Sequence, residues 1–313
     1  MIKVQNISKS YDNVQALKDI SFSVKKGELF GLIGPDGAGK TSLMRILMTL
    51  LLPTGGNAQM GGLEVVRDYR EIRRMVGYMP GRFSLYQDLT VEENLSFFAT
   101  VFGTTIEENY ELIRDIYVQI EPFKNRLAGK LSGGMKQKLA LSCALIHKPE
   151  ILVLDEPTTG VDAVSRKEFW EMLKKLQQQD ITILVSTPYM DEAGLCDRVA
   201  LMQKGEILSI DSPGGIVANY ERPLLAVRSD DMHRLIQDLR KWDQVETAYA
   251  FGQFVHVTPA NNRLKPEELK MYLEQLNHRH VQSSLIQAGI EDVFMALMGN
   301  SQLKVQRQCL TIE

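Results

Sequence analysis

The chain has 313 residues, which by the usual size of domains suggests about two of them. Apolar residues make up 44% and charged residues 24%, with a formal net charge of −3, so the composition argues against a disordered chain and we expect no nucleic-acid partner. Three widely spaced cysteines, Cys143, Cys196 and Cys309, fit neither a disulfide framework nor a zinc site, and we expect free thiols.

No stretch of the sequence approaches the roughly 20 apolar residues that cross a bilayer. The longest candidate, 42–52, contains Arg45 and ends at Pro53, and residues 1–10 have no apolar core like that of a signal peptide. The sequence therefore predicts a cytoplasmic protein that reaches a membrane only through a partner.

The first part of the chain alternates short strands and helices. Apolar and polar residues alternate over 1–7 and 14–24, which predicts strands, and an apolar run predicts a buried strand over 28–34. A glycine-rich loop follows. Apolar residues at helical spacing then predict a helix over 40–52 that stops at Pro53.

The middle of the chain combines a helical insertion with two buried strands. Residues 90–146 show amphipathic helical spacing and no convincing strand, and we place this insertion at about 84–146. The apolar runs 151–155 and 181–187 predict strands buried on both faces, with a helix over 165–179 between them. That order indicates parallel pairing in an α/β sheet whose faces are covered by helices.

The last third of the chain has a different pattern. Residues 198–211 predict a hairpin that turns at Lys204-Gly205, and we place a domain boundary near Tyr220, which gives domains over 1–220 and 221–313. The second is a small accessory α+β domain. Its expected strands are 224–228, 245–249 and 254–257, and its expected helices are 232–242, 266–276 and 290–298.

Residues 34–41 fit the phosphate-binding pattern G-x-x-x-x-G-K-[ST], with a predicted strand before them and a helix after them. Glycines let backbone N–H groups approach phosphate oxygens, and the helix start adds partial positive charge. Lys40 would reach the β- and γ-phosphates, and the Thr41 hydroxyl would bind Mg²⁺. The residues expected to bind ATP in this loop are Gly34, Pro35, Asp36, Gly37, Ala38, Gly39, Lys40, Thr41 and Ser42.

The predicted strand 151–155 delivers two carboxylates at its C-terminal end. Asp155 suits a Mg²⁺ site, and Glu156 can polarise an attacking water, which makes Glu156 the candidate catalytic residue. An apolar run that ends in two acidic residues is a weak signal alone. Downstream of a phosphate-binding loop it becomes a strong one.

A second glycine motif, Leu131-Ser132-Gly133-Gly134, precedes a helix predicted over 135–146. Ser132 is a candidate N-cap, and Gly133 and Gly134 expose backbone donors at an anion-binding helix start. Because this start is separate from the phosphate-binding loop, we expect it to contact phosphate across a dimer interface. A helix cap beside a glycine turn would be the simpler interpretation if the motif stood alone.

This combination resembles the ATP-binding cassette (ABC) family, whose signature motif is LSGG, over residues 1 to about 220. The resemblance implies that Tyr11 stacks on adenine, that Asp162 belongs to the loop running between the two sites of a dimer, and that the ligands are ATP and Mg²⁺. The sequence of 290–299 resembles the last helix of cassette subunits that serve drug-, lipid- and polysaccharide-type exporters. Those subunits pair with an integral-membrane permease.

Two residues depart from the family pattern: Gly81 stands where the family usually has Gln, and Pro188 where it usually has His. A proline side chain neither donates nor accepts hydrogen bonds, so it cannot hold a γ-phosphate. No other histidine is placed to substitute. His147 precedes the strand 151–155, and the rest lie in the second domain, where we expect His278 and His280 to be solvated surface residues.

The predicted fold is an α/β P-loop NTPase sheet with an antiparallel β subdomain and a helical insertion, followed by the small α+β domain. The resemblance implies a P-loop ATPase, the peripheral motor subunit of a membrane exporter, in which two cassettes sandwich two ATP molecules. Phe83, Leu85 and Tyr86 follow position 81, where cassettes generally dock the permease.

The two departures predict a degenerate site that hydrolyses ATP slowly, and they favour a heterodimer with a second cassette over a homodimer. One alternative is a weakly hydrolytic regulatory cassette. The other is a soluble cassette protein of DNA repair or translation, although those usually carry tandem cassettes or long coiled-coil insertions.

Overall fold

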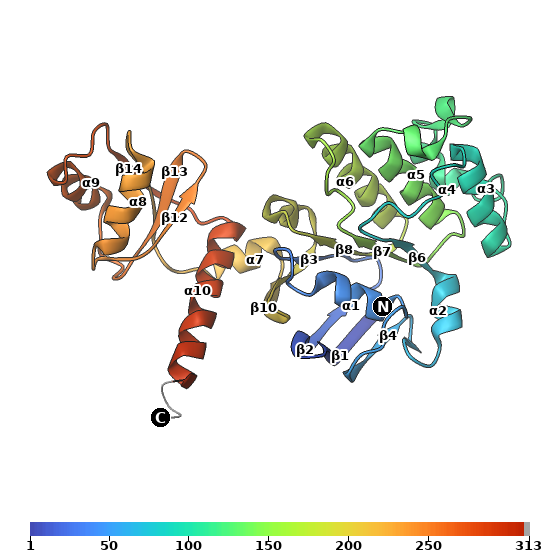
Figure 1. Cartoon of the computed structure of the whole chain (residues 1–313), viewed down its shortest axis with the longest axis horizontal. Coiled ribbons are helices and arrows are strands. Elements are labelled where there is room, and N and C mark those ends of the chain that lie inside the picture. Colours follow the sequence, from blue (N-terminus) through green and yellow to red (C-terminus); the bar gives the residue numbers. More distant parts are fainter. Residues whose placement is uncertain (310–313) are drawn as a thin grey trace. The chain divides into compact units, whose positions relative to one another are not determined.

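The computed structural model describes the backbone of residues 1–309 and the side chains of residues 1–299 (Figure 1). It divides into two compact units, Met1–Pro213 and Gly214–Glu313. Among the described helices, none is long and apolar enough to cross a membrane.

The first unit is built on a six-stranded sheet with the order β10-β9-β3-β8-β7-β6. All neighbouring strands are parallel except β9 and β10, which form the predicted hairpin. Strands β3, β7 and β8 are buried along their whole length, which explains their nearly continuous apolar sequences. The strands are β3 (Leu29–Ile33), β6 (Val76–Met79), β7 (Ile151–Asp155), β8 (Thr182–Thr187), β9 (Arg198–Gln203) and β10 (Glu206–Asp211).

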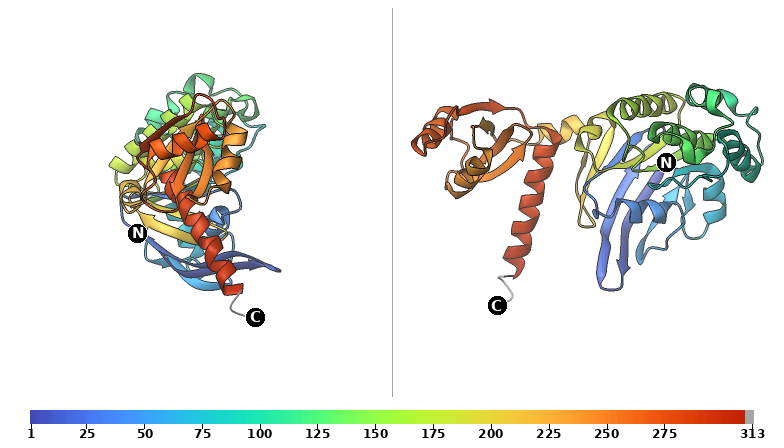
Figure 2. Two further views of the ribbon diagram at one scale, coloured as in Figure 1. Left: turned by 90° about the vertical axis from the view of Figure 1, so that its left-hand side faces the viewer. Right: turned by 45° about the horizontal axis from the view of Figure 1, so that its top comes forward.

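An antiparallel sheet with the order β2-β1-β4-β5 completes the core of this unit, and its long strands β1 and β2 are the blue pair in Figure 2. One side of β2 is buried through Leu17, Ile20, Phe22 and Val24, and Phe22 stacks on Phe30 of β3 with ring centroids 5.3 Å apart. The strands are β1 (Ile2–Tyr11), β2 (Val14–Val24), β4 (Gly55–Met60) and β5 (Leu63–Glu64). The helix α1 (Lys40–Leu47) contributes to the same apolar core.

The helix α1 is shorter than its sequence pattern predicted. It ends at Leu47, and Thr49 then adopts a left-handed conformation with φ 61°. An L-residue in this conformation interrupts a right-handed helix. The predicted helix, which extends to residue 52, is therefore too long by five residues.

Helices fill residues 90–146, where the structure describes no strand and only an isolated bridge between Thr90 and Leu127. In Figure 1, α3 and α4 both lie beside α5. The helix α3 starts with a capping box, in which the Glu93 N–H donates to Thr90 Oγ1 at 3.2 Å and the Thr90 N–H to Glu93 Oε2 at 2.7 Å. The helices of this unit besides α1 are α2 (Tyr69–Met75), α3 (Val91–Phe102), α4 (Tyr110–Tyr117), α5 (Gly133–Leu145) and α6 (Ala163–Gln178).

The second unit is a four-stranded antiparallel sheet with the order β12-β13-β11-β14, built from two β-α-β passages. This is the split β-α-β arrangement. Leu235 and Leu239 of α8 and Leu269 and Leu273 of α9 pack into its core. The elements are α7 (Pro213–Ala218), β11 (Leu224–Arg228), α8 (Met232–Lys241), β12 (Val245–Phe251), β13 (Phe254–Pro259), α9 (Pro266–Gln275), β14 (Gln282–Ile286) and α10 (Ile290–Cys309).

The structure tests the expectations for two histidines and two of the cysteines. His278 is not on the surface, because its side chain is 1% exposed and its Nε2 lies 3.0 Å from Asp238 Oδ2. His280, by contrast, is exposed as predicted. Cys143 and Cys196 are buried free thiols whose pKa values are raised by burial, and the side chain of Cys309 lies outside the described residues.

Candidate functional site

The loop between β3 and α1 depends on its glycines. Gly37 and Gly39 have φ values of 78° and 102°, a region that L side chains rarely adopt. A Cβ on Gly39 would also lie 2.7 Å from the carbonyl oxygen of Ala16, and one on Gly34 would lie 2.2 Å from that of Met202. The loop therefore keeps this shape only with glycine at these positions.

Lys40, the first residue of α1, is buried under this loop. Its side chain is 3% exposed, and its Nζ donates to the carbonyl oxygens of Gly34 at 2.7 Å and Pro35 at 3.1 Å. The same Nζ lies 3.1 Å from Glu156 Oε1. A buried ammonium needs such partners, and the cation is thus fixed between the loop and the end of β7.

The hydroxyl of Thr41 meets the carboxylate of Asp155. Thr41 Oγ1 donates to Asp155 Oδ1 at 3.2 Å, and Ser186 Oγ of β8 donates to the same oxygen at 2.7 Å. Asp155 is 3% exposed. A hydroxyl and a carboxylate are hard oxygen ligands, which suits Mg²⁺ held by one or two protein groups together with phosphate oxygens and water.

Glu156 has a backbone conformation that is rare for a residue with a side chain, with φ 50°. Its N–H donates to the carbonyl oxygen of Ser186 at 3.1 Å and to Ser186 Oγ at 3.0 Å. Ser186 therefore holds both acidic residues in place, and sequence analysis missed it. The available signal was a serine within an otherwise apolar strand.

The two positions that depart from the family pattern border these carboxylates. A Cβ on Gly81 would lie 3.1 Å from the Asp155 carbonyl oxygen and 3.7 Å from its Oδ2. Pro188 directly follows β8, whose residue Ser186 is paired with Asp155 of β7. Neither residue brings a side chain that can form a hydrogen bond.

Tyr11, at the end of β1, lies beside the same loop. The residue is 42% exposed, and its hydroxyl oxygen lies 3.4 Å from Ser42 Oγ. Asp36 is exposed at the outer part of the loop, whereas Ala38 is buried. Tyr11 is therefore partly accessible, with Lys9 Nζ over its ring at 5.2 Å from the centroid.

The LSGG motif forms a second cluster, together with the loop before α6. Ser132 caps α5 by accepting the Met135 N–H at 3.3 Å, and Asp162 Oδ1 caps α6 by accepting the Val164 and Ser165 N–H groups at 3.1 and 3.0 Å. Hydrogen bonds from Ser165 are the largest cause of the lowered pKa of Asp162.

The two helix starts in this second cluster lie close together. A Cβ on Gly134 would be 2.7 Å from Ser165 Oγ, and one on Gly133 would be 3.6 Å from the Gly160 carbonyl oxygen. Among the hydrogen bonds and ion pairs of the described residues, none joins 132–134 to 34–42. The structure thus brings Tyr11, Lys40, Thr41, Asp155 and Glu156 together and groups 132–134 with Asp162 instead.

Comparisons with known proteins agree with one another. A family model described as ABC transporter matches residues 17–159. The Nod factor export ATP-binding protein I of Burkholderia thailandensis is 34% identical over 305 residues, which cover 95% of this chain and 97% of that protein. The probable multidrug ABC transporter ATP-binding protein YbhF of Escherichia coli is 36% identical over 290 residues, or 91% of this chain. The match spans only 50% of that relative's length.

The fold has solved counterparts. The ATP-binding cassette MJ0796, described as dimeric and bound to ADP and Pi in a post-hydrolysis state, matches with a TM-score of 0.62 at 27% identity. That match covers 68% of this chain and 98% of the solved chain.

Proposed function

The chain belongs to the ATP-binding proteins of the ABC transporter family, and from that premise we propose that it binds and hydrolyses Mg-ATP to drive export through a membrane-embedded partner. The observation that carries this proposal is a chain of contacts between the start of α1, the end of β7 and β8. Lys40 pairs with Glu156 and Thr41 donates to Asp155, and Ser186 of β8 is hydrogen-bonded to both acidic residues.

The nucleotide would bind along the glycine loop. Lys40 would exchange its contacts with Glu156 and the loop carbonyls for the β- and γ-phosphates, and Thr41 with Asp155 would hold Mg²⁺. Mg²⁺, when bound, neutralises charge that develops on the phosphates. Tyr11 offers its exposed ring to adenine, a type of contact worth about 1–3 kcal/mol per base.

Glu156 is the residue we assign to orienting and activating the attacking water. Its carboxylate lies beside Lys40 and is fixed through its backbone to Ser186. Gly81 and Pro188 add no donor to the developing charge, and each lost donor costs on the order of 10²–10³ in rate in other enzymes. We therefore propose that this site holds ATP and hydrolyses it slowly.

The separation of the two clusters supports an arrangement in which two cassettes share their sites. Ser132, Gly133 and Gly134 present backbone donors at the start of α5, near Ser165 and Gly160, and no hydrogen bond or ion pair of the described residues joins them to the glycine loop of the same chain. We propose that they complete the ATP site of a second cassette. A partner with an intact half-site would let Ser132–Gly134 serve a competent site, which favours a heterodimer.

A groove of about 360 Å³ between β6, α3 and α5 supports a permease contact. Leu85, Tyr78 and Phe98 line it, and the exposed ring of Tyr86 lies at 4.9 Å from that of Phe97 on α3. Ser84 and Leu85, which also line the groove, follow position 81 in the sequence. We propose that it receives a cytoplasmic helix of the permease, which would place the chain at the inner face of the membrane.

The nucleotide assignment is tested by calorimetric titration of Mg-ATP into the purified chain and its Lys40→Ala variant. Lys40 is the one cation contacting the glycine loop among the described residues, so we expect its loss to abolish detectable binding. The same substitution at exposed Lys26 is the matched control and should leave binding unchanged. If Lys40→Ala retained micromolar affinity for Mg-ATP, the assignment of the glycine loop as the nucleotide site would be wrong.

A further inference from the structure

The helix α2 of the first unit carries arginines that no acidic side chain neutralises. Arg70, Arg73 and Arg74 are all exposed. Among the described residues, none of the three forms an ion pair with a carboxylate. Glu71 is the one acidic residue of the helix, so three arginines against one glutamate leave α2 with a net charge of +2.

The contacts that these arginines do make are with neutral groups. Arg73 donates from Nε to Thr49 Oγ1 at 2.8 Å and from Nη2 to the Thr49 carbonyl oxygen at 2.9 Å. Arg70 Nε donates to the Tyr69 hydroxyl at 3.2 Å, and both guanidinium groups lie over the Tyr69 ring, at 5.7 and 5.4 Å from its centroid. A guanidinium has five N–H donors, so donors remain free on Arg70 and Arg73 as well as on Arg74.

Exposed apolar side chains surround the same helix. Leu50 is 56% exposed and Leu52 65%, and Val66 and Tyr69 are exposed as well. Leu50 lines the groove described above together with Arg73, and Val66 lies three residues before Tyr69. We call these four side chains and the three arginines of α2 the α2 surface. Apolar side chains that gather on an exposed surface are typical of an interaction site.

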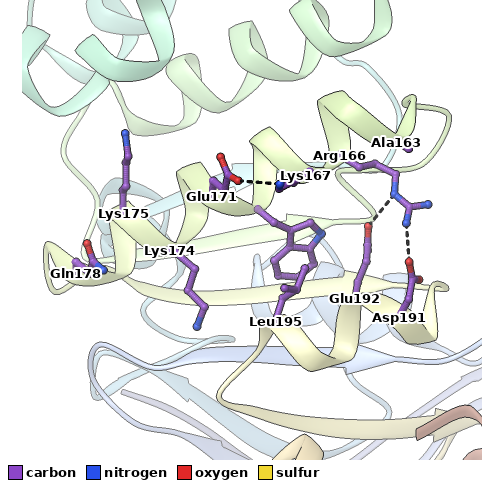
Figure 3. Close-up of a pocket in the computed structure, with 11 residues that line it drawn as sticks. Ala163, Arg166, Lys167, Glu171, Lys174, Lys175, Gln178, Asp191, Glu192 and Leu195 are labelled. Carbon is purple, nitrogen blue, oxygen red and sulfur yellow. Dashed lines mark hydrogen bonds and ion pairs between the residues drawn. The ribbon is translucent and has the colours of Figure 1, made fainter. Parts of the chain in front are cut away.

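The cations of α6 show the contrast (Figure 3). Arg166 Nη2 lies 2.8 Å from Asp191 Oδ2, and Arg166 Nε lies 3.4 Å from Glu192 Oε1. Lys167 Nζ lies 4.0 Å from Glu171 Oε1. These cations are neutralised within the chain. The arginines of α2 lack such carboxylates, so their counter-charge has to come from outside the described residues.

We propose that the α2 surface binds the headgroups of anionic phospholipids. The free arginine donors bind the phosphate oxygens, for which a guanidinium has the matching geometry. The leucines, Val66 and the Tyr69 ring enter the boundary between headgroups and acyl chains, where aromatic and apolar side chains of peripheral proteins lie. A free phosphate would explain the arginines and leave the exposed leucines without a role.

The position of this surface agrees with the permease contact, a step that rests on the proposed function. Leu50 and Arg73 line the groove that we assign to a cytoplasmic helix of the permease. A helix seated there would bring the α2 surface close to the lipid headgroups. The chain would then contact the membrane directly as well as through its partner.

Flotation of the full chain with lipid vesicles tests the proposal. We expect binding to vesicles of phosphatidylcholine with phosphatidylglycerol, none to phosphatidylcholine alone, and a loss of binding as the salt concentration rises. An arginine near an anionic membrane contributes about fivefold in affinity, so Arg70→Gln combined with Arg74→Gln should weaken binding about 25-fold.

The matched control removes the same charge from α6. Lys167 and Lys175 are exposed, and each lies within 4.0 Å of a carboxylate (Figure 3 shows Lys167 with Glu171). Lys167→Gln combined with Lys175→Gln should therefore retain the affinity for anionic vesicles. If this variant lost as much affinity as the α2 variant, binding would depend on overall charge and the assignment to α2 would be wrong.

The apolar part of the surface is tested separately with Leu52→Ser. Because a side chain that is exposed in the free protein becomes buried among lipids, this change should weaken binding to anionic vesicles about fivefold. An unchanged affinity would show that no side chain enters the lipid and would overturn insertion.

Two results would overturn lipid binding itself. One is equal binding to vesicles with and without phosphatidylglycerol. The other is an α2 variant that loses binding to polyglutamate while no chain binds vesicles, which would indicate an acidic protein partner instead.

Mg-ATP titration separates this proposal from the proposed function. The variant Arg70→Gln with Arg74→Gln should bind Mg-ATP like the unsubstituted chain, which also shows that it is folded. A chain that binds anionic vesicles through α2 and binds no Mg-ATP would overturn the proposed function and leave the α2 surface in place.

Discussion

At the scale of single residues, the candidate site depends on how Ser186 arranges two neighbouring carboxylates. Its hydroxyl donates to Asp155 Oδ1 and accepts from the Glu156 N–H, while Glu156 keeps a left-handed backbone conformation. Strained conformations of this kind persist only where the surroundings over-determine them, and they cluster at functional sites. The direction of the Glu156 carboxylate toward Lys40 follows from that constraint.

Restoring the missing donors should accelerate ATP hydrolysis. We expect Pro188→His to raise kcat by about 10-fold to 10²-fold, because it returns one donor to the transition state. Gly81→Gln should gain less, since a Cβ at position 81 would lie only 3.1 Å from the Asp155 carbonyl oxygen and must displace it slightly. Steady-state turnover at saturating Mg-ATP, with Tm for each variant, checks this order. Unchanged kcat in both variants and in the double variant would contradict it.

At the scale of elements, prediction from sequence worked where burial dominates. The strands β3, β7 and β8 and the helices α5 and α6 are marked by apolar runs or helical spacing, and the structure confirms them within a few residues. The sequence did not reveal α2, β4 and β14. These elements are short or half exposed and carry many polar residues, so tertiary contacts rather than local pattern select them.

The site divides in the same way. The glycine loop, Asp155 and Glu156 could be predicted from motif spacing along the chain. The role of Ser186 could not, because it depends on which strands pair. Strand order follows from packing of the whole sheet, and the residues next to Ser186 in the sequence carry no pattern that indicates it. The same holds for Glu192, which collects hydrogen bonds from Thr158 and Thr187 only after folding.

The packing of α5 against α3 should make stability sensitive to mild acid. At the end of α5, His147 stacks on Phe102 of α3 with ring centroids 3.8 Å apart. Burial lowers the pKa of His147 from 6.5 to about 4, and neither ring nitrogen has a hydrogen-bond partner among the described residues. The unfolded chain therefore binds this proton more readily than the folded one, and stability present above pH 6.5 is lost as the pH falls toward 4.

Thermal unfolding between pH 7 and 4 measures this effect. We expect His147→Phe, which keeps an aromatic ring on Phe102, to lose less stability across that interval than the unsubstituted chain. His280→Phe is the matched control, because His280 is 82% exposed and should leave the pH dependence as it is. Parallel curves for His147→Phe and the unsubstituted chain would show that His147 titrates normally.

At the scale of the whole molecule, the proposed nucleotide site lies within one of the two units. Each has its own apolar core, and the residues of the proposed nucleotide site all come from Met1–Pro213. We propose that 221–313 is an accessory domain that folds separately. A chain that ends at Tyr220 should then bind Mg-ATP with unchanged affinity in calorimetry. A folded truncation that binds none would show that the cut passes through the nucleotide-binding part.

The most direct test of the account is the rate of ATP hydrolysis by the purified chain alone, measured beside its Glu156→Gln variant. We propose that Lys40, Thr41 and Asp155 hold Mg-ATP, and that Gly81 and Pro188 leave the γ-phosphate without two donors. We expect stoichiometric binding with turnover well below about 1 s⁻¹, the lower end of common enzyme rates. Turnover at or above that rate, abolished by Glu156→Gln, would contradict it.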